Sequence, residues 1–247
     1  MTEIKTLVGS SVNEQQSKID LAVRLRSSAI PNAELLDNLG VYMTRQSMSR
    51  VLFMHGIYQQ ILPVHGVVME FGVRWGQNLS LFSNFRGIHE PYNYTRKLIG
   101  FDTFDGFPSV AAEDGSAVAV GDYAVVPGWE VEVESILGFH EKNAPIPHKR
   151  KFELVKGDAT VTLPAYLARH PETIIALAYF DFDLYQPTKD CLEAILPHVT
   201  QGTVLAFDEL NCADLPGETL AVREVLGLSN HAIRRDSSSP LTSYIVL

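Results

Sequence analysis

Cysteine is scarce in this chain, and its two cysteines, Cys191 and Cys212, lack the spacing of a metal site. Two thiols are too few for a disulfide scaffold, so we expect them to be free or buried. Long apolar runs are also missing, because none approaches the roughly 20 residues of a membrane-spanning helix. Residues 1–10 lack the basic start and apolar core of a signal peptide. We therefore expect a soluble, cytoplasmic protein that does not bind a membrane.

Positive charge is in deficit, with a formal net charge of −9 and a pI near 5.3. This balance excludes a broad basic surface for nucleic acid, although it leaves room for a local basic pocket. Hydrophobic residues make up 46% of the 247 residues, enough for one large core. We expect a single α/β domain over residues 64–247. Residues 1–63 are predicted to form a helical cap that serves in oligomerisation.

The segment 67–80, VVMEFGVRWGQNLS, organises the rest of the chain. Its apolar run ends at Glu70 and passes through Gly72 and Gly76 into a polar helix start, the pattern of a strand, a tight turn and a helix. A ligand over the strand end needs close backbone approach, and a Cβ there is expected to collide with it. Dinucleotide sites carry a third glycine that is absent here. The acid at the strand tip repels phosphate and suits the cationic S-adenosylmethionine (SAM) better than NAD.

Further strands and helices alternate along the chain. The predicted strands are 67–70, 97–101, 152–155, 174–180 and 204–207, with 232–235 and 243–247 as a closing antiparallel pair. The predicted helices are 14–27, 33–39, 48–62, 79–85, 131–141, 160–170, 188–199 and 218–226. This order predicts a Rossmann-like, mostly parallel seven-stranded sheet with helices on both faces. Residues 103–150 form a lid-like insertion in this scheme.

An acidic residue follows each of the five parallel strands. These residues are Glu70, Asp102, Asp158, Asp181 and Asp208. Ligands of open α/β sheets bind at the carboxyl ends of the strands, so we expect the acids to surround one site. Asp102, after the second strand, is the predicted ribose ligand. Asp158 is also explained as the cap of the helix that starts near Thr160.

Asp181 and the pair Asp208-Glu209 predict a cation site, because converging carboxylates are costly unless a cation neutralises them. Oxygen ligands favour a hard divalent ion, Mg²⁺ first, with Ca²⁺ or Mn²⁺ as alternatives. Such an ion can orient a sugar or catechol hydroxyl and lower its pKa. His140, His148 and Asp181 itself are the candidates for the base that removes the proton.

Five segments also carry a resemblance to a known family. EFGVRWGQN, GFDTFDGFPS, LVKGDATVTLP, YFDFDLYQPT and AFDELN resemble the macrocin O-methyltransferase (TylF/MycF-type) family, from about Leu36 to the C-terminus. The resemblance implies a class I SAM- and metal-dependent sugar O-methyltransferase fold, which is usually oligomeric. It is nearest to the branch that methylates nucleotide-linked deoxyhexoses such as TDP-rhamnose, which includes an enzyme of enediyne (calicheamicin) biosynthesis.

The resemblance also implies roles for particular residues. The resemblance points to residues that hold SAM: Glu70, Gly72, Asn78, Asp102, Asp158 and Ala159. We add Arg74 and Thr103 to complete the candidate cofactor site. Asp181, Asp208 and Glu209 are the implied metal ligands, with Glu209 longer than the aspartate usual in the family. The resemblance also implies a catalytic histidine before the third strand, for which we choose His140. Asp181, a candidate base from the cation-site argument, is the second predicted catalytic residue.

Two alternatives remain beside SAM-dependent methylation of a deoxysugar hydroxyl in natural-product or polysaccharide biosynthesis. The same sheet can serve an NAD-type sugar-nucleotide oxidoreductase, which the missing third glycine disfavours. A non-catalytic metabolite-binding protein is the other alternative. The acidic set argues against it, since an idle cleft has little reason to keep uncompensated charge.

Overall fold

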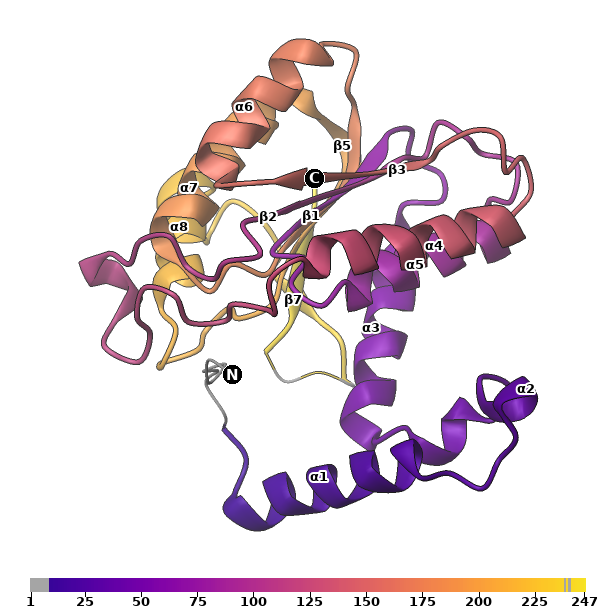
Figure 1. Cartoon of the computed structure of the whole chain (residues 1–247). Coiled ribbons are helices and arrows are strands. Elements are labelled where there is room, and N and C mark those ends of the chain that lie inside the picture. Colours follow the sequence, from indigo (N-terminus) through magenta and orange to yellow (C-terminus); the bar gives the residue numbers. More distant parts are fainter. Residues whose placement is uncertain (1–8, 238, 240) are drawn as a thin grey trace.

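The computed structural model describes residues 9–237, 239 and 241–247. Its centre is a seven-stranded sheet in the order β3-β2-β1-β4-β5-β7-β6 (Figure 1). The strands are β1 (Val67–Phe71), β2 (Leu98–Asp102), β3 (Phe152–Lys156), β4 (Ile175–Phe180), β5 (Val199–Phe207), β6 (Arg234–Arg235) and β7 (Ser243–Val246). β1 to β5 are parallel, whereas β7 runs antiparallel to β5 and to β6. The predicted mostly parallel sheet with a closing antiparallel pair is confirmed.

Helices cover both faces of the sheet. The helical elements are α1 (Val12–Arg26), α2 (Asn32–Leu35), η1 (Leu39–Tyr42), α3 (Arg45–Gln60), α4 (Gln77–His89), η2 (Ala112–Asp114), α5 (Trp129–Asn143), α6 (Ala159–Arg169), α7 (Tyr185–Ile195), η3 (Leu196–His198) and α8 (Gly217–Val225). α3, α4 and α5 pack on one face of the sheet, and α6, α7 and α8 on the other (Figure 1). None of the described helices is long and apolar enough to cross a membrane.

Alternating side chains of the central strands build these two cores. On β5, Val204 and Ala206 face the α3–α5 layer, while Leu205 and Phe207 face the α6–α8 layer. All six residues of β4 are buried, as expected for a strand covered on both faces. The strand ends are thereby held at one edge of a rigid sheet.

Tertiary contacts move some helix ends away from their predicted positions. α4 continues to His89 instead of ending at Arg86-Gly87. Arg86 is buried and pairs with Glu141 of α5, and this contact holds the extra turn in place. α7 starts at Tyr185, because Pro187 fits within its first turn, where its missing N–H has no helical partner to lose. The predicted helix 33–39 is divided between α2 and η1.

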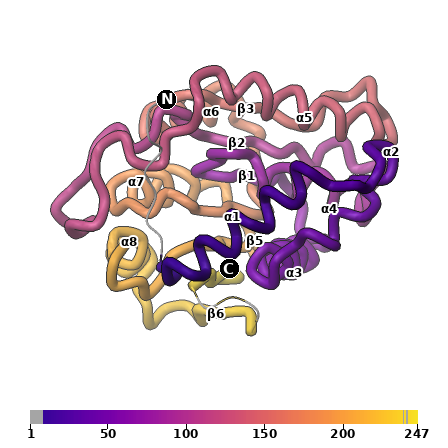
Figure 2. Tube along the Cα trace, turned by 60° about the horizontal axis from the view of Figure 1, so that its bottom comes forward, coloured from indigo at the N-terminus to yellow at the C-terminus, as the bar shows by residue number. Residues whose placement is uncertain are grey.

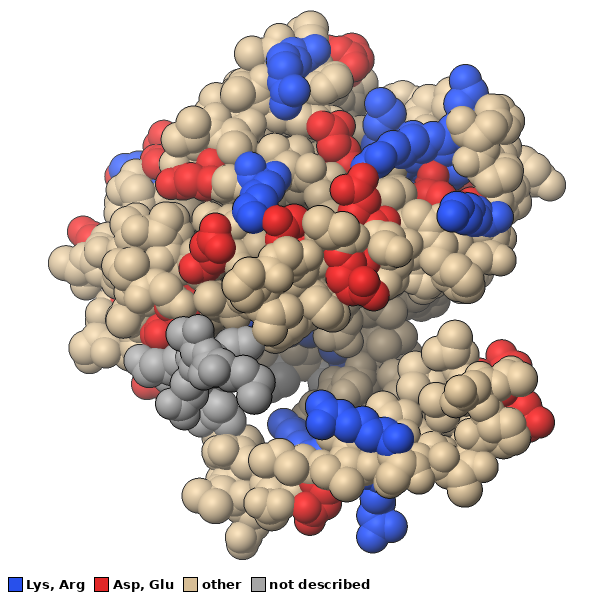
Figure 3. All heavy atoms as spheres, viewed as in Figure 1, with Lys and Arg blue, Asp and Glu red and all other residues tan. Residues whose placement is uncertain are grey.

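Residues 9–63 differ in how they pack against the sheet. α3 packs into the core through Phe53, Met54, Ile57 and Tyr58. In contrast, within the described chain, α1, α2 and η1 bury no residue. We call residues 11–42 the arm. Its helix α1 lies below the sheet and apart from it in Figure 1, and crosses in front of the main body in the turned view of Figure 2. The space-filling view shows the arm below the main body, with basic side chains along it (Figure 3).

Candidate active site

A cavity of about 410 Å³ opens at the carboxyl ends of the parallel strands. β1 and β4 are neighbours at its centre, where the strand order changes direction, which is the usual ligand site of an open α/β sheet. The volume lies within the range of small-molecule sites. The predicted site residues on its wall are Gly72, Arg74, Asn78, Asp102, Thr103, Asp158, Ala159, Asp181, Asp208 and Glu209. Glu70 and His140 are not on the wall.

The glycine turn after β1 is required by the protein's own packing. Gly72 has a φ of 96°, and a Cβ on it would lie 2.0 Å from the backbone oxygen of Asp181. Gly76 has a φ of 84°, and its Cβ would lie 2.8 Å from a methyl group of Val133. The sequence pattern suggested a ligand as the reason for these glycines. In the structure, neighbouring residues of the chain already occupy the space that a Cβ would need.

Glu70 lies beneath the cavity and does not line it. Its side chain is 0% exposed, and the carboxyl group lies beside the side-chain amide of Asn78 and the backbone N–H of Leu79. Burial raises the pKa of Glu70 well above its usual value, which favours a neutral carboxyl group. The structure therefore does not place this carboxyl group where the sequence argument expected it, in direct reach of a ligand.

Asp102 holds two loops of the cavity together. One carboxylate oxygen accepts a hydrogen bond from the N–H of Arg74 at 2.7 Å, and the other accepts one from the N–H of Phe104 at 2.5 Å. Burial raises the pKa of Asp102, while these N–H groups act in the opposite direction. Each oxygen keeps a second lone pair for a hydroxyl donor. Asp102, the residue predicted to bind ribose, thus lies on the cavity wall, where two backbone N–H groups hold its carboxylate in place.

Asp158 is the N-cap of α6, and its Oδ1 accepts hydrogen bonds from the N–H and hydroxyl of Thr160 at 2.9 and 2.7 Å. The helix-cap explanation is therefore confirmed for this residue. Asp158 also lines the cavity together with Gly157 and Ala159. Asp158 therefore both caps α6 and forms part of the cavity wall.

Four carboxylates gather beyond β4 and β5. They are Asp181, Asp183, Asp208 and Glu209. Burial, followed by the charge of Asp208, raises the pKa of Asp181 well above its usual value. Burial and nearby carboxylates raise the pKa of Asp183 to about 8 and the pKa of Glu209 to about 7. Asn78 donates to Asp181 at 3.4 Å. The cluster is therefore short of positive charge.

Arg50 of α3 is a site residue that the sequence argument missed. Its guanidinium forms a two-point contact with Asp208, which joins Nη1 to Oδ1 and Nη2 to Oδ2, the latter at 3.0 Å. The hydroxyl of Tyr179 also donates to Oδ1 of Asp208. Arg50 and Asp208 are 158 positions apart in the sequence. The apolar pattern that predicted the helix 48–62 gave no sign that Arg50 would reach the acids after β5.

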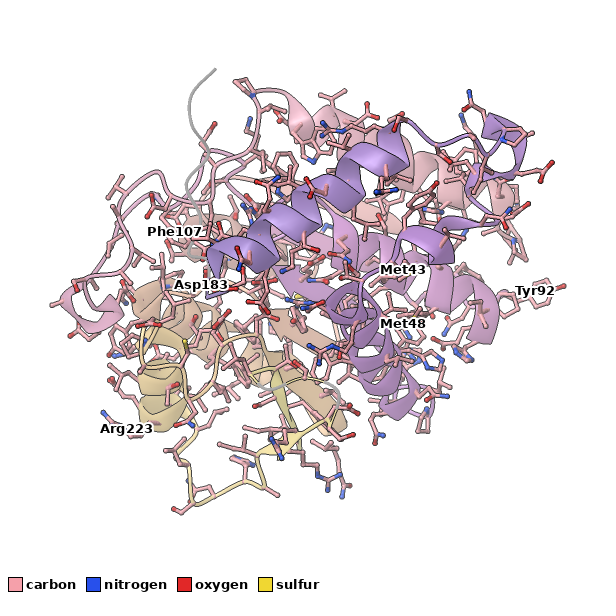
Figure 4. The ribbon with its side chains drawn as sticks, turned by 90° about the horizontal axis from the view of Figure 1, so that it is seen from below. Met43, Met48, Tyr92, Phe107, Asp183 and Arg223 are labelled. Atoms are coloured by element: carbon pink, nitrogen blue, oxygen red, sulfur yellow. The ribbon has the colours of Figure 1, made fainter. Side chains whose placement is uncertain are left out.

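The insertion supplies an aromatic side to the cavity. The rings of Phe107 and Tyr123 lie 5.1 Å apart, and the guanidinium of Arg74 lies 4.9 Å from the centre of the Tyr123 ring. Tyr123 also forms a hydrogen bond with Asp183. In the view from below, the labelled Phe107 and Asp183 project close to each other at the same end of the molecule (Figure 4). Phe107 and Asp183 lie within motifs of the resemblance, whereas Tyr123 had no motif to reveal it.

Arg74, Tyr123 and Asp183 also share an unusual backbone. Their φ values are 47°, 64° and 62°, in the left-handed region that side chains other than glycine rarely adopt. Strained residues of this kind collect at functional sites, where the surrounding structure holds them. Their presence on one wall supports this cavity as the functional site.

The second half of the insertion packs into the main body. Val133 and Leu137 of α5 belong to the core on the α3–α5 face. His140 lies in the last turn of this helix, half-buried, with its ring near Phe139. Burial lowers the pKa of His140. Among the described residues, no histidine lines the cavity, so the structure does not bring His140 or His148 to the acids.

The acids do not form a ready-made metal site in this arrangement. Across the described ranges, no group of three or more His, Cys, Asp or Glu residues is placed to hold a metal ion. Both carboxylate oxygens of Asp208 are engaged by Arg50, and one also by Tyr179. The predicted ligands are thus brought to one cavity, but one of them is paired with a guanidinium.

Comparison with known proteins gives a full-length match among solved structures. No family model and no curated protein matches the chain. The crystal structure of CalS11, a calicheamicin methyltransferase, matches at 42% identity and a TM-score of 0.94, covering 100% of this chain and 97% of that one. The apo structure of CalS11, described as a TDP-rhamnose 3'-O-methyltransferase of calicheamicin biosynthesis, matches at 40% identity and a TM-score of 0.86, covering 97% and 96%.

The O-methyltransferase NovP shares the fold, at 18% identity and a TM-score of 0.57, over 80% of this chain and 79% of that one. The match to CalS11 covers the whole of this chain, and it agrees with the family resemblance of the sequence motifs. This chain belongs to the family of O-methyltransferases that includes CalS11.

Proposed function

We propose that this protein transfers the methyl group of SAM to a hydroxyl of a nucleotide-linked deoxyhexose, with TDP-rhamnose as the first candidate. The observation that carries the proposal is full-length similarity to CalS11 at 40–42% identity. The cavity at the strand ends supports it, because it is large enough for a small-molecule ligand. The reaction is a direct displacement at the methyl carbon, in which the protein supplies proximity and alignment.

The donor is proposed to lie along the loop after β1. Asp102 would accept hydrogen bonds from the ribose hydroxyls, and Asp158 and Ala159 would lie beside the adenine. Arg74 lines the cavity, and its Nε is buried without a hydrogen-bond partner, so its guanidinium suits the carboxylate of SAM. Thr103 and Asn78 complete the contacts from the loops after β2 and β1. Glu70 acts from below as a neutral support of this loop.

The acidic cluster fits a divalent cation by the chemistry of its donors. The four carboxylates of the cluster line the cavity together with Asp102, Asp158 and Asp190, whereas Arg50 and Arg74 are the basic side chains of its described wall. Asp181, Asp208 and Glu209 would hold the ion, with Mg²⁺ preferred and Ca²⁺ or Mn²⁺ as alternatives. When bound, such an ion supplies charge that lowers the pKa of the acceptor hydroxyl.

A carboxylate of the cavity wall is the proposed proton acceptor. Asp181 lies next to the glycine turn at Gly72, and its carboxylate accepts a hydrogen bond from Asn78. Of the two catalytic residues expected from the sequence, it is the one on the cavity wall. His140 remains a candidate only if α5 or the acceptor changes position on binding. We therefore assign proton removal to Asp181 first.

The arm is proposed to join subunits in a homo-oligomer. Its exposed apolar side chains include Val12, Ile19, Val23, Leu36, Leu39 and Val41. A helical segment that buries none of its described residues gains little stability from packing against its own chain. Contact with a second copy would bury this apolar surface.

The direct test is incubation with SAM and TDP-rhamnose, with mass spectrometry of the sugar nucleotide. A product heavier by one methyl group, together with S-adenosylhomocysteine, is the expected result. Calorimetry with S-adenosylhomocysteine separates the donor from the acceptor. If the donor product binds and TDP-rhamnose gains no methyl group, the acceptor assignment is wrong. If S-adenosylhomocysteine does not bind, the methyltransferase proposal itself fails.

A further inference from the structure

The contact between Arg50 and Asp208 engages both carboxylate oxygens of one proposed metal ligand. Nη1 and Nη2 of Arg50 each take one carboxylate oxygen, and Tyr179 adds a second donor to Oδ1. The Asp208 side chain is 9% exposed and that of Arg50 is 29% exposed. A two-point guanidinium–carboxylate contact is among the stronger hydrogen-bonded pairs in proteins. A cation that binds Asp208 in the cavity must therefore compete with a guanidinium that already engages both carboxylate oxygens.

The pair leaves most of the acidic cluster without compensation. Asp181, Asp183 and Glu209 share the wall with Asp208. One guanidinium carries one positive charge, so it balances Asp208 alone. A divalent ion would balance more of the cluster, but its preferred ligands include the carboxylate that Arg50 holds. The Arg50 guanidinium and the divalent ion thus both require the carboxylate of Asp208.

We propose that Arg50 competes with the divalent cation for Asp208. This inference rests on the proposed cation site. In the metal-free protein, the guanidinium neutralises Asp208 and keeps the cavity assembled. On metal binding, Asp208 would exchange the guanidinium for the ion, and the Arg50 side chain would be released from this contact. Arg50 is therefore a positioning residue that sets metal affinity, and α3 connects the N-terminal segment to the site.

The test is titration of metal-stripped protein with Mg²⁺ by calorimetry and with Mn²⁺ by electron paramagnetic resonance of the free ion. Arg50→Gln removes the competing charge. Arg150→Gln is the matched control, because Arg150 pairs with Glu134 on the surface, with a 58% exposed side chain, and loses the same charge outside the cavity. We expect Arg50→Gln to bind both ions on the order of tenfold more tightly than the parent protein. The control should stay within about twofold, because surface charges contribute little.

Arg50→Lys gives a second measurement if Arg50→Gln folds poorly. Lysine keeps the charge but cannot form the two-point contact. Arg50→Lys should therefore bind metal more tightly than the parent protein and less tightly than Arg50→Gln. Equal affinities, or weaker binding by Arg50→Gln, would overturn the proposal and make Arg50 a support for the ligand.

S-adenosylhomocysteine is titrated into the same samples. If it binds while no variant binds either ion, the competition is refuted and the methyltransferase stands. If it fails to bind, the proposed function fails, whatever the ions do.

Discussion

The backbone oxygen of Asp181 lies 2.0 Å from the position that a Cβ on Gly72 would occupy. The turn after β1 and the end of β4 are therefore fitted to each other at the centre of the cavity. This contact joins the loop proposed to hold the donor to the carboxylate proposed to act on the acceptor. Any side chain at position 72 must disturb both.

Gly72→Ala should destabilise the protein by about 3 kcal/mol or more, because it combines a backbone clash with a positive φ. Urea unfolding followed by circular dichroism measures the change. Gly138→Ala is the control, since nothing lies within 4 Å of its added Cβ and it is within a helix. That change should be neutral or slightly stabilising. Equal stabilities for the two variants would contradict this account of the turn.

Asp181→Asn should abolish turnover and leave binding of S-adenosylhomocysteine within a few-fold of the parent protein. The substitution keeps the shape but removes the charge that the proposed cation and the acceptor proton require. Single-turnover methyl transfer and calorimetry measure the two effects separately. Normal turnover in this variant would refute the carboxylate-centred mechanism.

His140→Asn distinguishes the two catalytic candidates. His140 lies outside the described cavity wall, so we expect turnover to change by less than about tenfold, against the 10²- to 10⁴-fold loss typical of a missing general base. Turnover of both variants is measured at saturating SAM. A loss as large as that of Asp181→Asn would return the base role to His140 and require α5 to move on binding.

Glu90→Gln should reveal a structural ion pair far from the site. Glu90 accepts from Arg96 at 3.0 Å and from Tyr58 at 2.8 Å. Burial alone would raise the pKa of Glu90, but these hydrogen bonds lower it below its usual value. A lowered folded-state pKa contributes stability that is present above the unfolded value of about 4.3 and is lost as pH falls through the folded value.

The expected loss on Glu90→Gln is about 2 kcal/mol at pH 7, since hydrogen bonds to charged groups are involved. The difference from the parent protein should shrink below about pH 4.3, where the carboxylate gains its proton. Thermal unfolding across pH measures this. Glu134→Gln breaks an exposed pair with Arg150 and should change stability by less than about 1 kcal/mol. A pH-independent difference for Glu90→Gln would contradict the assignment.

The arm predicts association through its apolar residues. Val23→Asp and Leu36→Asp should lower the oligomeric state or weaken it, as measured by sedimentation velocity at several concentrations, because both side chains are exposed in the isolated chain. Val161→Asp, an exposed valine on α6, is the control and should have no effect. Parent protein that sediments as a monomer would remove the role assigned to the arm.

Local sequence patterns determined the order of strands and helices and the position of the sheet edge that carries the site. Apolar runs that end in an acid predicted β1, β2, β4 and β5, because strand burial and strand ends are written in neighbouring residues. The same patterns placed Asp102, Asp181 and Asp208 at one cavity, since parallel strands present their carboxyl ends together. The motifs around these acids also identified the family.

Only the tertiary structure decided which of these acids is paired and which candidate lies outside the site. Arg50 and Asp208 are 158 positions apart, and no periodicity within a helix specifies a partner at that distance. Glu70 is sealed beneath the turn by packing, and His140 is carried away on a helix that the core holds in place. Burial and long-range charge pairing depend on how layers pack against each other, so they appear only when the whole chain has folded.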